Sequence, residues 1–238
     1  MIEIAISLAI IGIALVAIIG VLPLGVNVQK DNREETIINQ DATVLMEAIR
    51  SGASSPYGFD LTNYVYAITN IQTEYPPGTP APIGYGSYLT NNARIIGLLS
   101  TPEFTNPNNG APLNNLFGVN NYNSNHVVAY VRSISGPASE KPPQNNDIVV
   151  SGSFGYRVIC ENVPVAVDTN SLNSPYNKQL TANLHELRLT FQWPQLPNGN
   201  VGSKRQTFRT MVAGQIVQTT NGGQWLYFFQ PQSFTNAP

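Results

Sequence analysis

The chain has 238 residues, of which only 11% are charged, with a formal net charge of −2 and a pI near 5.6. The charged fraction is less than half of the ~25% typical of globular proteins, and the balance gives no general attraction for nucleic acid. No nucleic-acid partner is therefore expected. The single cysteine, Cys160, cannot form an internal disulfide, so the fold must depend on its core and hydrogen bonds.

The first 25 residues form an apolar segment long enough to cross a membrane. No charged residue lies between Glu3 and Lys30. A bilayer core of about 30 Å needs roughly 20 apolar residues in a helix, and Ile4 to Leu24 meet that requirement. A secretory signal peptide would need basic residues before this segment and a small-residue cleavage site after it, and neither is present. Residues 1–25 are therefore predicted to be a membrane segment.

Glu3 is the one acid at the start of this segment. A carboxylate buried in lipid costs up to a few kcal/mol, which suggests either access to water or a partner. Two alternatives stay open. Glu3 reaches water at the lipid interface, or it pairs with a positive charge from another chain, most simply the α-amino group of a neighbouring Met1.

Small residues repeat along one face of the predicted helix. Ala5, Ala9 and Gly12 are spaced four and three residues apart, so they share a face and let another helix backbone approach closely. Farther along, Gly20 and Pro23 weaken the helix, because glycine is flexible and proline removes one backbone donor.

Glu3 followed by Ala9-Ile10-Ile11-Gly12 resembles the N-terminus of type IV pilins and of the pseudopilins of type II secretion systems. The resemblance covers about the first 50 residues. It implies a removed leader peptide, N-terminal methylation, and a helical homopolymer built by an assembly machinery. By the same resemblance the subunit is anchored in the inner membrane before it joins an extracellular filament at the cell surface.

Two positions differ from the usual pattern of this family. The acid is normally the fifth residue of the mature chain and is third here, and the helix-bending proline normally lies at the spacing of Gly20. The resemblance implies a stretched or melted segment within Gly12 to Gly25, and an ordinary kink at Pro23 is the alternative.

Residues 26–52 are predicted to be the amphipathic second half of the helix. An apolar stripe of Ile37, Ile38, Val44, Leu45 and Ile49 accompanies charged residues that are expected to face outward, namely Lys30, Asp31, Arg33, Glu34, Glu35, Asp41, Glu47 and Arg50. Gly52 and then Ser54-Ser55-Pro56 end the helix. The predicted domains are thus the helix, 1–52, and a β-rich head, 53–238.

Alternating patterns in the head predict an antiparallel sheet with long loops, which makes the fold class α+β. The predicted strands are Val65–Ile71, His126–Ile134, Gly155–Val167, Leu184–Trp193, Gln206–Val217 and Gln224–Gln230, with a short helix at Asn92–Ser100. The segment Tyr75–Gly84 is rich in proline and glycine, so a loop without regular structure is expected there.

No enzyme motif is found in the sequence. His185 and Glu186 are neighbours on a predicted strand, so their side chains point to opposite faces, and His126 is expected to lie at the surface. The segment Asp168–Asn173 offers oxygen ligands for calcium but only one carboxylate, so no metal or cofactor is predicted.

The sequence therefore predicts a non-enzymatic structural subunit of a type IV pilus-like filament. Met1, Glu3, Ala5, Ala9, Gly12, Gly20 and Pro23 are its predicted assembly residues. Two alternatives stay open: a minor pilin or pseudopilin, and a monomeric binding or adhesion domain held by a single membrane anchor.

Overall fold

The computed structural model describes residues 2–52, 60–73, 81–85, 89, 91–105, 124–137, 152–165, 175–196, 199–221 and 224–234. By their contacts the residues group into two compact units, Met1–Asn39 and Gln40–Pro238. The first unit is helical, and the second combines the last turns of the same helix with a β-sheet. This is the α+β architecture that the sequence predicts.

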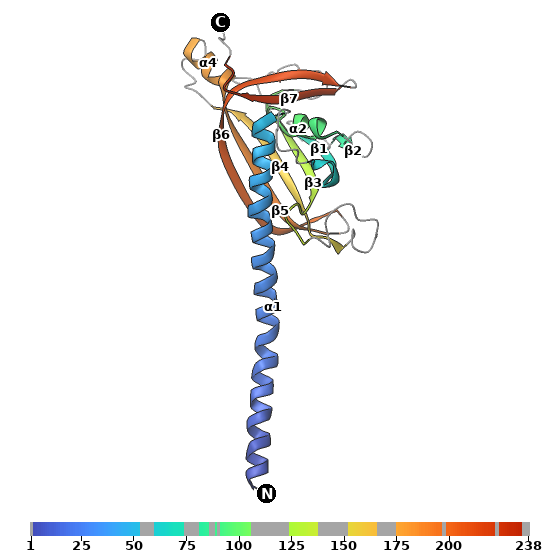
Figure 1. The fold of residues 1–238 in the computed structure, drawn as a ribbon, viewed down its shortest axis with the longest axis vertical. Coiled ribbons are helices and arrows are strands. Elements are labelled where there is room, and N and C mark those ends of the chain that lie inside the picture. The colour runs from blue at the N-terminus through green and yellow to red at the C-terminus, as the bar shows by residue number, and fades with distance from the viewer. Residues whose placement is uncertain are drawn as a thin grey trace. The chain divides into compact units, whose positions relative to one another are not determined.

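The long helix α1 runs from Ile2 to Ser51 without interruption, with Pro23 inside it (Figure 1). The melted segment predicted within Gly12 to Gly25 is therefore wrong for the single subunit. Proline removes one backbone hydrogen bond, whereas melting a turn would leave several backbone groups unpaired among apolar side chains. A continuous helix therefore loses fewer backbone hydrogen bonds than a melted one. The kink at Pro23 stays a prediction.

Gly52 ends the helix in a conformation that favours glycine. Its φ angle is +63°, and a Cβ atom at this position would lie 2.4 Å from the carbonyl oxygen of Phe229. Glycine is the usual residue at such a left-handed helix end because it has no Cβ. The end of α1 can therefore approach the backbone of the sheet directly.

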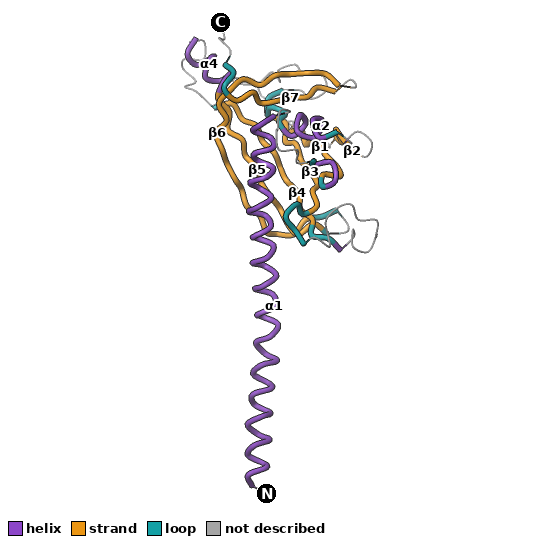
Figure 2. The backbone as a smooth tube through the Cα atoms, in the orientation of Figure 1, coloured by secondary structure: helices purple, strands orange, loops and turns teal. Residues whose placement is uncertain are grey.

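All neighbouring strands of the sheet are antiparallel, in the order β2-β1-β3-β4-β5-β6-β7 (Figures 1 and 2). The strands are β1 Val65–Thr73, β2 Ala81–Tyr85, β3 Ser124–Arg132, β4 Gly155–Pro164, β5 Leu184–Gln195, β6 Val201–Asn221 and β7 Gln224–Pro231. Every strand predicted from alternation is present, although individual ends move by one to five residues. The sheet explains why the alternating patterns hold.

One face of the sheet forms the core of the head. On β5, Leu187, Leu189 and Phe191 are fully buried and alternate with partly exposed residues. Their register partners on β4 are Asn162, Cys160 and Val158, which are also buried. Alternation with a period of two places these side chains on the same face, as the sequence pattern predicts.

The strand β6 changes partner part-way along its length. Residues from Val201 to Ala213 pair with β5, and Gly214 to Asn221 pair with β7. Gly214 has a φ angle of +131°, and a Cβ there would lie 2.2 Å from the carbonyl oxygen of Gln230. Figure 1 shows the strand bending toward β7. Glycine permits this bend.

The remaining elements are a 3-10 turn at Leu61–Asn63 and two helices, α2 Asn92–Leu99 and α4 Pro175–Asn183. The helix α2 was predicted, and its Gly97 packs closely on β7, where a Cβ would lie 2.8 Å from Cβ of Leu226. The helix α4 was not predicted. The loop predicted for Tyr75–Gly84 is wrong for the residues of β2. This strand lies at the edge of the sheet, where the backbone donor that Pro82 lacks is not required.

Candidate functional site on the apolar helix

The first half of α1 exposes an unbroken apolar surface. Sixteen large apolar side chains between Ile2 and Val28 keep between 53% and 77% of their surface accessible. Burying one such side chain completely stabilises by ~1.5–3 kcal/mol, so the exposed half of each is worth roughly 1 kcal/mol. The sum is comparable to the whole stability of a typical domain, ~5–15 kcal/mol. A surface of this size requires lipid or another protein to cover it.

By length and composition, α1 is able to cross a membrane. It contains an 18-residue window of mean hydropathy 3.0, none of which is buried within the chain. A membrane anchor is the coarse localisation that this supports. Apolar core helices and N-terminal signal sequences share the same composition, so the helix does not distinguish a permanent anchor from a filament core.

The predicted small-residue face leaves space along the helix. A Cβ atom added to Gly12 would meet nothing within 4 Å, and the same holds for Gly20 and Gly25. A shallow hollow also lies along α1, lined by Ala17, Ile18, Val21, Leu22, Gly25, Val26 and Gln29. The hollow forms because Ala17 and Gly25 are small. They lie four residues before and four residues after Val21, on the same face of the helix. It was not singled out from the sequence, although the spacing was visible there.

Glu3 lies in the first turn of α1 with an exposed side chain. Its backbone carbonyl accepts a hydrogen bond of 2.8 Å from Oγ of Ser7. Ser7 carries the one hydroxyl of the apolar segment, and this bond gives the hydroxyl a partner on the same helix. No water is needed to satisfy it, which suits an apolar environment. Met1 lies outside the described residues, so the pairing of Glu3 with a terminal amine stays a prediction.

No protein-family model matches the chain, and no curated protein sequence or solved structure matches it. The likeness to type IV pilins therefore rests on the N-terminal residues alone.

The head carries a row of charged side chains across β3, β4 and β5. In this row the surface position predicted for His126 is corrected. His126 is not a plain surface residue, because its Nδ1 lies 3.0 Å from Oε1 of Glu161 and both side chains are 25% exposed. Contact with Glu161 raises the pKa of His126, and contact with His126 lowers the pKa of Glu161. Arg188 lies opposite Glu161 in the register and binds Glu186 at 2.7 Å. Both carboxylates are thus engaged in ion pairs.

His185 and Cys160 lie in the core of the head. His185 is 6% exposed, its ring lies 5.8 Å from that of Phe229, and burial lowers its pKa to about 4. Glu186 points to the opposite face, as predicted. Cys160 is 2% exposed, and burial raises its pKa, which keeps the thiol neutral and unreactive.

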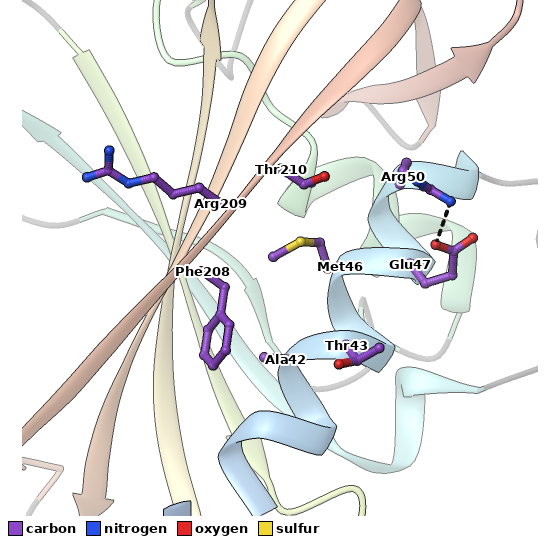
Figure 3. A pocket seen from close by; sticks show the side chains of 8 residues that line it. All are labelled: Ala42, Thr43, Met46, Glu47, Arg50, Phe208, Arg209 and Thr210. Atoms are coloured by element: carbon purple, nitrogen blue, oxygen red, sulfur yellow. Dashed lines mark ion pairs between the residues drawn. The ribbon is translucent and has the colours of Figure 1, made fainter.

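An open groove lies between the last turns of α1 and the strand β6 (Figure 3). Phe208 and Met46 extend toward this space, whereas Arg209 points away from the helix. The rim carries an ion pair of 3.0 Å between Glu47 and Arg50, two neighbours on one helix face. The walls also carry the hydroxyls of Thr43 and Thr210.

No group of three metal-binding side chains occurs among the residues that the structure describes. The calcium alternative at Asp168–Asn173 lies outside those residues.

Proposed function

We propose that the protein is a structural subunit of a type IV pilus-like filament, which polymerises through the apolar half of α1. The observation that carries the proposal is the helix itself. Its apolar half exposes sixteen large apolar side chains on all sides, has a face of small residues, and carries one acid, Glu3, in the first turn. An anchor that only contacts lipid needs the apolar length but neither the small-residue face nor the acid.

In this mechanism the helix exchanges one apolar environment for another. In the membrane its side chains contact lipid, and in the filament they contact the helices of other copies. The transfer exposes no apolar surface to water. The carboxylate of Glu3 needs a positive partner once water is removed, and the terminal amine of a neighbouring subunit can supply it. Head-to-tail contacts between subunits extend a helical polymer when the rotation between neighbours does not close into a ring.

The decisive experiment is the isosteric variant Glu3→Gln, which removes the charge and keeps the shape. Breaking a buried pair by removing one partner costs ~3–5 kcal/mol, which lowers the equilibrium constant for subunit addition by roughly two to four powers of ten. Electron microscopy of cells should then show few filaments, while immunoblots of the membrane fraction show normal amounts of subunit.

Glu35→Gln is the matched control, because Glu35 is an exposed acid on the same helix beyond the apolar half. Its filaments should be as abundant as those of the wild type. Filaments of normal number and length in the Glu3→Gln variant would refute the charge-pair role.

The uninterrupted helix of the single subunit keeps a second candidate open, a binding or adhesion domain with a permanent single-pass anchor. Site-specific cross-linking from Gly12 separates the two. A filament subunit gives a ladder of homopolymers in sheared surface material, whereas the anchored domain stays in the membrane fraction as a monomer.

A further inference from the structure

A buried carboxylate joins the last turns of α1 to the sheet. Asp41 was predicted to face outward, but its exposed fraction is 0%. The prediction assumed that every charge on this helix is solvated. Asp41 in fact lies on the apolar stripe, three residues after Ile38 and four before Leu45, both of which are buried. Glu34 is also buried, at 5% exposure, and lies 3.9 Å from Lys30 on the same helix.

Both oxygens of Asp41 are fully used. Oδ2 accepts hydrogen bonds of 2.8 Å from the backbone N–H of Ile134 and from the hydroxyl of Tyr156. Oδ1 accepts one of 2.8 Å from the backbone N–H of Ser135 and another from its hydroxyl. Burial and the nearby Asp41 raise the pKa of Tyr156, so its hydroxyl stays protonated and donates.

These donors come from two separate parts of the head. Ile134 and Ser135 follow the end of β3, and Tyr156 lies on the neighbouring strand β4. Two of the four donors are backbone N–H groups, whose positions are set by the sheet and which cannot act as acceptors. A one-turn slide of the helix would carry Asp41 about 5.4 Å away and leave these amides without an acceptor.

A second fixed point lies at the end of the helix. Gly52 meets the backbone of β7 so closely that a Cβ would overlap the carbonyl oxygen of Phe229. Asp41 and Gly52 are eleven residues apart, or about 16 Å along the helix axis. Two contacts at that separation define both the axial position and the rotation of the helix on the sheet.

We infer that Asp41 is a positioning residue, which sets the register of the head on the last turns of α1. The inference deepens the proposed function and rests on it in one respect: in a polymer built on α1, the register decides where the head contacts fall along the filament. Apolar contacts alone specify such a register weakly, because Leu, Ile and Ala side chains pack in several neighbouring positions. The carboxylate of Asp41 meets all four donors in only one position of the helix on the sheet.

The test is the variant Asp41→Asn in the full chain, solubilised in detergent. Asparagine has the same shape, but either orientation of its amide places an NH₂ group against a backbone N–H. Hydrogen exchange at the amides of Ile134 and Ser135 should become at least about tenfold faster. The matched control is Glu47→Gln, which changes an exposed acid two turns farther along and should leave both rates unchanged.

The register itself is measured by the distance between two spin labels, on cysteines that replace the exposed Thr43 of the helix and Arg205 of β6. Buried Cys160 does not compete for the labels. The wild type and Glu47→Gln should give one narrow distance distribution. Asp41→Asn should give a broadened or shifted one, an effect that a loss of stability without a change of register does not produce.

A distribution in Asp41→Asn that matches the control overturns the inference. If this variant loses its near-ultraviolet circular dichroism, Tyr156→Phe takes its place, because it removes one donor and keeps the carboxylate. A distribution in Tyr156→Phe that stays as narrow as the control then overturns the inference as well. Both measurements use single subunits, so failure of the filament proposal would show in the Glu3→Gln experiment and not here.

Discussion

Replacing Gly12 by leucine should affect the single subunit and its assembly in opposite directions. A Cβ at Gly12 meets nothing within 4 Å, so the larger side chain creates no clash within the chain. Leucine is also a better helix former than glycine by ~0.8–1 kcal/mol. The isolated helix should therefore become slightly more stable, and far-ultraviolet circular dichroism in detergent should show unchanged or increased helix.

Assembly should respond the other way, because the small face formed by Ala5, Ala9 and Gly12 is where a second helix approaches. Overpacking a close contact costs ~1–3 kcal/mol, which lowers the equilibrium constant for each added subunit by roughly 5- to 150-fold. Filament yield in sheared surface fractions should fall accordingly, as counted by electron microscopy.

Ala14→Leu is the matched control, since Ala14 is two residues on and about 200° around the helix from Gly12. It enlarges an exposed small residue on the opposite side and should retain most of the filaments. Wild-type filament yield in the Gly12→Leu variant would refute the close approach of helices at this face. Equal loss in both variants would show that the small face is not the determining surface.

Two further predictions concern the head. Gly52→Ala should lower the free energy of unfolding by at least about 1–2 kcal/mol because of the left-handed φ angle alone, and by more because the new Cβ overlaps with Phe229. Thermal melts measure this loss. The control is Gly199→Ala, where φ is +81° and the space is open, and its loss of stability should be smaller. The pKa of His126 is raised in the fold, so its pairing stabilises fully below pH ~6.5 and less as pH rises through the folded pKa. Melting temperatures from pH 6.5 to 8.5 should decline in the wild type and decline less in His126→Gln; equal slopes would contradict this role.

The sheet could be predicted from the sequence because alternation on a half-buried strand is a local signal. Leu187, Leu189 and Phe191 are core residues because of the side they take on the strand, and that side is visible in the order of the residues. The long helix was equally visible, since 50 residues of helix leave a strong pattern. The charged row on the sheet was not, because His126 and Glu161 meet through the pairing of strands 35 residues apart.

Tertiary placement overrides composition in two of the elements that sequence reasoning missed. The segment of β2 contains Pro82 and reads as a loop, yet an edge strand needs donors on one side only. The helix α4, from Pro175 to Asn183, is short and polar, so it has no apolar stripe to detect. Proline at its first position, where no backbone donor is needed, was the one local indication.

Asp41 shows why charge and burial must be read separately along a helix. An acid that faces solvent and a buried acid are the same residue type. What distinguishes them is whether the residue lies on the apolar stripe of the helix. Ile38, Asp41 and Leu45 share a face, so a carboxylate there must either disrupt the stripe or meet donors supplied by the sheet. Two of the four donors are backbone amides that follow β3, and no sequence pattern predicts them. Glu3 poses the same question at the other end of the helix, where the proposed partner belongs to a second molecule. In both places an acid lies on an apolar surface, and at Asp41 the structure shows the groups that bind it.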